Sequence, residues 1–256
     1  MGEAMLSAIL AKGLSQPQDI SVSDVAETRR QYLKQKYGVI VTGDNRESAG
    51  SGEVVVLAVK PQTLAMVLAD LSGQLKPSQL VLSIVAGATI KTISSGLNHN
   101  RLVRVMPNTP AQIGEGMSVW TATPGVTKQQ KTWAGSILGA IGEEIYVDDE
   151  KYLDMATAVS GSGPAYFFLF VEALSEATVK LGFSPDFAEK LVRQTMLGSA
   201  HLIQKSGKTP AELRRMVTSP GGTTAEAIAA FEKGGFTQLV SQAVTAAYNK
   251  ARKLGS

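Results

Sequence analysis

Apolar residues in the first part of the chain occur in short continuous runs. The runs are residues 20–22, 39–41, 54–59, 80–84, 102–106 and 145–147. Such runs are typical of strands that are buried on both faces of a parallel sheet. Between them, residues 2–12, 25–37 and 63–71 have the composition and spacing of helices. Strands that alternate with helices at this pace predict a doubly wound parallel α/β sheet.

After residue 148 the strand pattern stops, and the chain predicts only helices. They are residues 164–181, 185–205, 210–217, 223–232 and 236–254, and proline opens three of them. We therefore expect an α/β domain over residues 1–150 and an all-α domain over residues 151–256. Residues 165–171 are apolar on every side of their helix. A helix of this kind has to be covered all round, which predicts a partner subunit.

Composition removes several classes of function. The 256 residues include 25 basic and 22 acidic ones, and this net charge of +3 is too small to indicate a nucleic-acid or membrane partner. No signal peptide is recognisable, and the absence of cysteine fits the cytoplasm and excludes thiolate chemistry. The two histidines, His99 and His201, are expected on the surface, without a part in catalysis.

The start of the chain resembles part of a nucleotide-binding turn. A Rossmann unit begins with a strand and a glycine-rich turn, followed by a helix whose amino end holds a pyrophosphate. Met1 and Gly2 match the end of such a turn, whereas its strand and first two glycines are absent. A plain amphipathic helix explains the same residues. Because the first strand of such a sheet is central, we expect the natural chain to carry roughly ten further residues before Met1.

An acidic residue stands where this fold binds a ribose. Asp24 follows Gly2 by 22 residues, at the end of the next predicted strand. Asp24 favours NAD because it repels a 2′-phosphate, whereas Ser23, Arg29 and Arg30 are able to hold one and favour NADP. A solvated helix face explains the two arginines equally well. Taken together, the sequence favours NADP slightly over NAD.

The most distinctive motif is Thr218-Ser219-Pro220-Gly221-Gly222-Thr223-Thr224, directly before a predicted helix. Paired glycines allow several backbone N–H groups to point to one place, and the helix terminus adds partial positive charge. The hydroxyls of Ser219, Thr223 and Thr224 add further donors. This pattern predicts a receptor for a small carboxylate, although a helix cap and a turn explain part of it.

Three further segments lie where α/β sheets bind ligands or where domains join. Lys60-Pro61 and Met106-Pro107-Asn108 follow buried strands, at the expected carboxyl edge of the sheet. Ser160-Gly161-Ser162-Gly163-Pro164 is a second glycine loop before a helix. As a hinge between domains, this loop needs no further function.

Together these motifs resemble pyrroline-5-carboxylate reductase over nearly the whole chain. In order, they are Met1-Gly2, Ala58-Val59-Lys60-Pro61, Ala86-Gly87-Ala88-Thr89-Ile90, Pro107-Asn108-Thr109-Pro110, Ser160-Gly161-Ser162-Gly163-Pro164-Ala165-Tyr166 and Ser219-Pro220-Gly221-Gly222-Thr223-Thr224. The resemblance implies a Rossmann domain followed by a helical domain that interlocks with a second subunit. It further implies homodimers, which often assemble into decamers, and the reduction of a small-molecule substrate, 1-pyrroline-5-carboxylate, to L-proline with NAD(P)H.

The resemblance also implies roles for particular residues. It places Met1, Gly2, Ser23, Asp24, Asn45, Ala58, Val59, Lys60, Pro61, Ala86 and Asn108 at the cofactor, with Ala58–Pro61 and Ala86 on the nicotinamide side. It places Ser219, Gly221, Gly222, Thr223, Thr224 and Glu150 at the substrate, with the Thr224 hydroxyl facing the ring nitrogen as the catalytic group. Many family members carry arginine where this chain has Val25, which weakens a strict preference for NADP.

Two alternatives remain open at this point. Another imine reductase or a β-hydroxyacid dehydrogenase has a similar build, but the latter generally uses a lysine on the first long helix after the domain junction. Here the early part of that helix is apolar until Glu172. The second alternative is a nucleotide-binding dimerisation module without catalysis.

Overall fold

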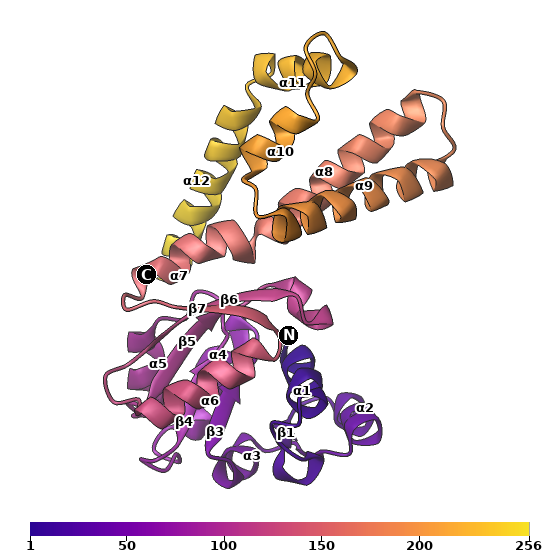
Figure 1. Cartoon of the computed structure of the whole chain (residues 1–256). Coiled ribbons are helices and arrows are strands. Elements are labelled where there is room, and N and C mark those ends of the chain that lie inside the picture. The colour runs from indigo at the N-terminus through magenta and orange to yellow at the C-terminus, as the bar shows by residue number, and fades with distance from the viewer. Residues whose placement is uncertain (256) are drawn as a thin grey trace. The chain divides into compact units, whose positions relative to one another are not determined.

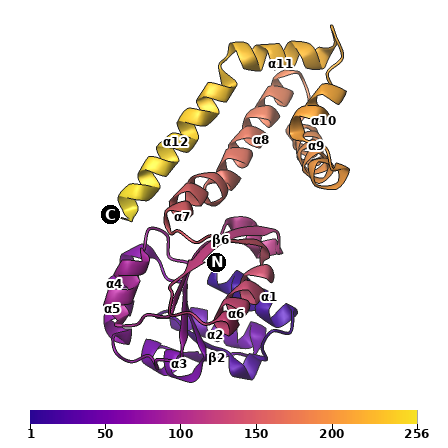
Figure 2. The same ribbon diagram turned by 60° about the vertical axis from the view of Figure 1, so that its left-hand side comes forward.

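The computed structural model describes residues 1–255, and the backbone divides them into two compact units (Figure 1). The first unit contains Met1–Ser162 together with the chain from Ala247 onward, and the second contains Gly163–Ala246. Figure 2 shows that the first is a mixed α/β structure and that the second is built from helices alone. The prediction of an α/β part followed by an all-α part is confirmed. The exact boundary after residue 150 stays a prediction.

Among the described residues, Met1–Ser162 of the first unit contain seven strands, seven α-helices and three short helical segments of other types. The end of α12 (Phe236–Leu254) also belongs to this unit. The strands are β1 (Ser21–Ser23), β2 (Ile40–Thr42), β3 (Val54–Leu57), β4 (Leu80–Ser83), β5 (Leu102–Met106), β6 (Gly116–Ala122) and β7 (Gly142–Tyr146). The helices are α1 (Gly2–Ala11), α2 (Glu27–Tyr37), α3 (Asn45–Ser51), α4 (Pro61–Leu71), α5 (Ile90–Leu97), α6 (Lys128–Gly139) and α7 (Lys151–Ala156). The three short segments are the 3-10 helices η1 (Pro17–Asp19) and η2 (Thr109–Ile113) and the π-helix η3 (Thr157–Gly161).

The main sheet has the order β3-β4-β5-β6-β7 and is parallel except at one pair. β3, β4 and β5 run parallel, whereas β6 is antiparallel to β5 and parallel to β7. The expectation of a parallel sheet is thus confirmed for most pairs and wrong for β5 with β6. The reason is the connection: only residues 107–115 separate these strands, and a parallel crossover needs about a dozen residues or more.

β1 and β2 form a separate parallel sheet. Within residues 1–255, β1 is hydrogen-bonded only to β2, and β3 only to β4. Each of these strands therefore keeps one edge without a strand partner within these residues. Helix α1 connects the two sheets by apolar packing: Met5 packs in the core of the main sheet, and Leu6 packs with Leu33 of α2 and with Val39, which directly precedes β2.

Helices cover both faces of the main sheet. One core joins β3 and β4 to α4 and α5, and the other joins β4 and β5 to α1 and α6. All four residues of β4 are buried, which explains its uninterrupted apolar sequence apart from Ser83. The doubly wound architecture is therefore confirmed.

The second unit consists of α8 (Gly163–Lys180), α9 (Pro185–Ser206), α10 (Pro210–Met216), α11 (Thr223–Lys233) and the first part of α12 (Phe236–Leu254). On α8, Phe167, Phe168 and Leu169 are 59–65% exposed in the single chain. Apolar surface of this extent marks an interaction surface, because water does not solvate it favourably. No helix among the described residues is long and apolar enough to cross a membrane.

Two further predictions from the sequence are wrong. Residues 160–164 are not a glycine loop, because η3 and the start of α8 continue the helical backbone there and Ser162 N–H donates to Thr157 O at 2.8 Å. His99 is buried rather than exposed, and its Nε2 lies 2.8 Å from Gln79 O.

Glu3 connects α1 to α2 through a cluster of donors. Its carboxylate accepts hydrogen bonds from Arg29 at 2.5 Å, Tyr37 at 2.8 Å, Lys36 at 3.0 Å and Tyr32 at 3.1 Å. The hydrogen bond from Arg29 and then that from Tyr37 do most to lower the pKa of Glu3 from 4.5 to about 2. The charged form is therefore the one that stabilises the fold.

We predict that Glu3→Gln lowers the thermal midpoint of unfolding at neutral pH. Because the folded pKa lies below the unfolded one, the stabilisation is complete above pH 4.5 and disappears as the pH falls toward about 2. The difference between wild type and variant should shrink over the same pH range. The exposed Glu115→Gln serves as control, and a difference that persists at the acid end would contradict this assignment.

Gly87 lies where the end of α12 meets the loop after β4. Its φ is +75°, and a Cβ at this position would lie 2.9 Å from the Cβ of Leu254. Both the left-handed backbone and the close contact therefore favour glycine.

We predict that Gly87→Ala is more destabilising than Gly13→Ala. Gly13 has a φ of +64° but nothing within 4 Å of the added methyl group, so its substitution costs only the backbone strain, about 1 kcal/mol. The clash at Gly87 should add about 1 kcal/mol or more. Denaturant titration of both variants measures the difference, and equal losses would show that α12 does not pack on Gly87.

Candidate active site

The parallel strands direct three loops to one edge of the main sheet. β3, β4 and β5 end side by side at this edge, with Leu57 paired to Ser83 and Ser83 to Arg104. The segments that follow them are residues 58–60, 84–89 and 107–108. The structure therefore brings together the loops that carry the residues predicted for the nicotinamide side, at the edge where open α/β sheets bind ligands.

The amino end of α1 lies against the first of these loops. A Cβ on Gly2 would be 3.1 Å from the Cβ of Ala58, so this close approach favours glycine. Met1 is the N-cap of α1, and Gly2 is its first residue. The first N–H groups of a helix have no intrahelical partner and attract phosphate, so the geometry fits the pyrophosphate of a dinucleotide.

The two residues predicted near the adenosine ribose are in contact. Ser23 Oγ donates to Asn45 Oδ1 at 2.9 Å, and Asn45 Nδ2 donates to Asp70 Oδ2 at 3.0 Å. Ser23 ends β1 and Asn45 begins α3, so the pair lies where the smaller sheet meets the next helix. Their contact is consistent with one shared subsite.

Asp24, Arg29 and Arg30 are held in different ways. Asp24 Oδ1 accepts the Ala26 N–H at 2.9 Å, and Arg30 Nη1 donates to the carbonyl groups of Asp24 at 2.7 Å and Val25 at 3.1 Å. Arg29 instead belongs to the Glu3 cluster. Of the two arginines, only Arg30 remains at the end of β1, next to Asp24.

The remaining predicted cofactor residues occupy the loops of the main edge. Lys60 is the N-cap of α4 and Pro61 its first residue, with Ala58 and Lys60 exposed and Val59 partly buried. Ala86 is exposed in the loop between β4 and α5. Asn108 Oδ1 accepts the Met117 N–H at 2.9 Å, so this side-chain oxygen connects the exit of β5 to β6.

The predicted carboxylate receptor is a tight turn in the second unit. Gly222 N–H donates to Ser219 O at 3.1 Å, and Gly221 has a φ of +68°. A Cβ on Gly222, the N-cap of α11, would lie 2.5 Å from Ser219 Oγ. Thr223 and Thr224 are the first two residues of the helix, so their N–H groups precede its first i→i−4 hydrogen bond.

Aromatic packing supports the helix that carries this turn. The ring centroid of Phe231 on α11 lies 6.4 Å from that of Phe170 on α8 and 5.5 Å from that of Phe236. The helix that carries the turn is thus held by aromatic contacts, although none of its residues is buried in the single chain. The structure brings Ser219, Gly221, Gly222, Thr223 and Thr224 together, whereas Glu150 belongs to the first unit.

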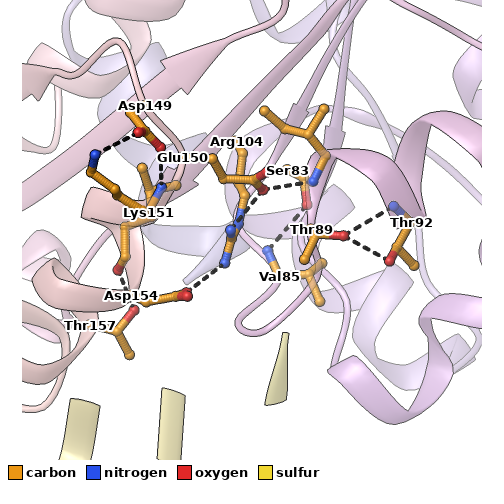
Figure 3. Close-up of polar contacts among 12 residues, drawn as sticks. Ser83, Val85, Thr89, Thr92, Arg104, Asp149, Glu150, Lys151, Asp154 and Thr157 are labelled. Atoms are coloured by element: carbon orange, nitrogen blue, oxygen red, sulfur yellow. Dashed lines mark hydrogen bonds and ion pairs between the residues drawn. The ribbon is translucent and has the colours of Figure 1, made fainter. Parts of the chain in front are cut away.

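A buried arginine that was not predicted lies on the central strand of the main sheet, β5 (Figure 3). The Arg104 side chain on β5 is 7% exposed and forms ion pairs with Glu150 at 2.7 Å and with Asp154 at 3.4 Å. A buried charge is costly unless it is paired, and these two carboxylates pair it. Only a weak indication of this cluster is present in the sequence. It consists of one arginine inside an apolar strand and of two acidic residues four positions apart.

The same cluster reaches the loop that carries Ala86. Glu150 Oε1 accepts the N–H of Ile90, the first residue of α5, at 2.7 Å. Ser83 Oγ accepts the Val85 N–H at 3.3 Å at the other end of the loop. Figure 3 shows both contacts together with Thr89, whose side chain caps α5.

Comparison with known proteins finds family models that match both parts of the chain. Residues 150–254 match the family model described as pyrroline-5-carboxylate reductase dimerisation. Residues 1–87 match the model described as NADP oxidoreductase, coenzyme F420-dependent. The second match covers the part of the chain in which the cofactor site is predicted.

Sequence and structural similarity to individual proteins extends over the full chain. A pyrroline-5-carboxylate reductase of Synechocystis sp. is 42% identical over 100% of this chain and 95% of its own. The structure of a pyrroline-5-carboxylate reductase from Coxiella burnetii is 40% identical, with a TM-score of 0.93 over 100% of this chain and 95% of that one. A Plasmodium falciparum pyrroline carboxylate reductase with NADP bound is 32% identical, with a TM-score of 0.89 over 100% and 95% of the two chains. The chain therefore belongs to the pyrroline-5-carboxylate reductase family.

Proposed function

We propose that this protein reduces 1-pyrroline-5-carboxylate to L-proline with NAD(P)H. Family membership over the whole chain supports this activity. The single structural observation that carries it is the turn of Ser219 to Thr224 at the amino end of α11. Neither a β-hydroxyacid dehydrogenase nor a module without catalysis is favoured by these relatives.

The first unit holds and orients the cofactor. NAD(P)H, when bound, supplies a hydride to the carbon of the ring C=N bond. The amino end of α1 receives the pyrophosphate, while Ala58–Pro61 and Ala86 line the nicotinamide side. The chemistry requires mainly orientation, because the hydride donor belongs to the cofactor and a protonated imine is already electrophilic.

The turn of the second unit holds the substrate. The backbone N–H groups of Gly222, Thr223 and Thr224 receive the carboxylate of pyrroline-5-carboxylate, as helix termini receive anions. The Thr224 hydroxyl orients the ring nitrogen or relays a proton to it. This role suits a chain without cysteine, in which His99 is buried and bound to Gln79. A contact of Glu150 with the substrate stays a prediction.

The cofactor preference is slightly toward NADP. The contact of Arg30 with the Asp24 carbonyl, at the end of β1, supports a role for this cation in holding a 2′-phosphate. The carboxylate of Asp24 opposes this preference, because it repels a phosphate group. The preference is therefore modest.

Oligomerisation follows from the dimerisation region and the exposed apolar residues of α8. We extend this to a homodimer that assembles into a decamer and works in the cytoplasm. Residues 1–150 serve the cofactor, and residues 151–256 serve the substrate and the partner subunit.

The proposed activity predicts that NAD(P)H is oxidised when 1-pyrroline-5-carboxylate is added. The loss of nicotinamide absorbance measures this oxidation. We expect a higher kcat/KM with NADPH than with NADH. The matched control omits the substrate. No oxidation with either cofactor would refute the proposed function, and a preference for NADH would refute the role of Arg30.

The role of Thr224 predicts that Thr224→Ala lowers kcat by about a hundredfold, with an unchanged KM for the cofactor. Thr224→Ser keeps the hydroxyl and should restore most of the activity. Thr132→Ala removes a hydroxyl that donates to Lys128 O within α6 and serves as control. Steady-state kinetics measure the effect, and an unchanged kcat would remove Thr224 from the mechanism.

A further inference from the structure

We infer that Arg104 and Glu150 form a positioning pair for hydride transfer, because together they hold the loop on which Ala86 lines the nicotinamide side. The inference rests on the proposed function and deepens it. It assigns Glu150 to the cofactor-side loop instead of to a direct contact with the substrate. Four observations carry it.

The first observation is that Arg104 is fixed on a rigid strand. β5 lies inside the main sheet, and Arg104 is paired with Ser83 of β4 and Thr121 of β6. Its side chain is 7% exposed, so water cannot replace a lost partner. A guanidinium group is planar and bonds two carboxylates through different nitrogens, which restricts where both can lie.

The second observation is that Glu150 Oε1 receives two donors. Arg104 Nη1 and the Ile90 N–H both lie 2.7 Å from this oxygen. The donors come from β5 and from the amino end of α5. The carboxylate therefore connects the strand to the helix, and a movement of this oxygen toward a substrate would break both bonds.

The third observation is that the loop between β4 and α5 is short and held at both ends. The Ser83 hydroxyl accepts the Val85 N–H where the loop begins, and Glu150 accepts the Ile90 N–H where it ends. Only residues 86–89 lie between the two anchored amides. A shift of Ile90 is therefore transmitted to Ala86 with little room for the loop to absorb it.

The fourth observation is that Asp154 and Glu150 both contact Arg104 but differ in their other contacts. Asp154 lies one turn further along α7, where residues four apart share a face, and it contacts Arg104 at 3.4 Å. No bond from Asp154 to the loop is found within residues 1–255. Asp154 supports Arg104 and α7, whereas Glu150 alone reaches Ile90.

The test is Glu150→Gln in the full chain, measured in a single turnover. Glutamine has nearly the same shape and keeps an oxygen for the Ile90 N–H, but it no longer pairs the charge of Arg104. Enzyme loaded with NADPH is mixed with excess 1-pyrroline-5-carboxylate in a stopped-flow instrument. We expect the rate constant of the first turnover to fall about ten- to a hundredfold, with unchanged amplitude and an unchanged KM for the substrate.

Two further variants make the result specific. Arg104→Lys keeps a cation but not the planar fork, so the same rate constant should fall; this variant also gives the answer if Glu150→Gln does not fold. Asp149→Asn is the matched control, because Asp149 is the neighbouring carboxylate, is exposed, and pairs with Lys151. It should keep the wild-type rate constant.

Three results would overturn the inference. A lower amplitude at the wild-type rate constant would mean that the pair only stabilises the fold. A raised KM for the substrate at an unchanged rate constant would assign Glu150 to the substrate, and wild-type behaviour of both Glu150→Gln and Arg104→Lys would leave the pair without a role. An inactive wild type, in contrast, would refute the proposed function itself.

Discussion

Parallel pairing of β3, β4 and β5 is the constraint on which the first unit depends. Because these strands run in one direction, the loops that follow them meet at one edge of the sheet. Because helices cover both faces, the strands tolerate few polar side chains. Arg104 is the charged exception, and its burial explains why two carboxylates gather at the same edge as the loops predicted to bind the cofactor.

The position of the amino end of α1 depends on packing, since no hydrogen bond between strands links the two sheets within residues 1–255. Met5 and Leu6 are neighbours in sequence, yet they enter different cores. The Glu3 cluster adds a polar connection from α1 to α2. These contacts set where Gly2 meets Ala58, and thus where the pyrophosphate is proposed to bind.

Patterns within a few consecutive residues were enough to predict the elements that such short segments determine. The buried strands were visible as apolar runs, and the turn before α11 was visible because seven consecutive residues form it. β6 was missed because polar residues interrupt Gly116–Ala122, and α3 was missed because Asn45–Ser51 has no apolar stripe. The pairing of Arg104 with Glu150 spans 46 residues, so it depends on the tertiary fold and leaves almost no local signal.

The charged cluster is better explained by positioning than by stability. Replacing a buried ion pair with apolar residues of similar volume is often neutral or stabilising, because ions lose their hydration on burial. A need for stability alone would therefore not require Arg104, Glu150 and Asp154. The cluster also fixes the start of α7, and the helical backbone continues from α7 into η3. In η3, Gly161 lies close to β5, because a Cβ on it would be 2.5 Å from Met106 Cε. Apolar residues could fill the same space, but they could not bond the Ile90 N–H and define one position for the loop that carries Ala86.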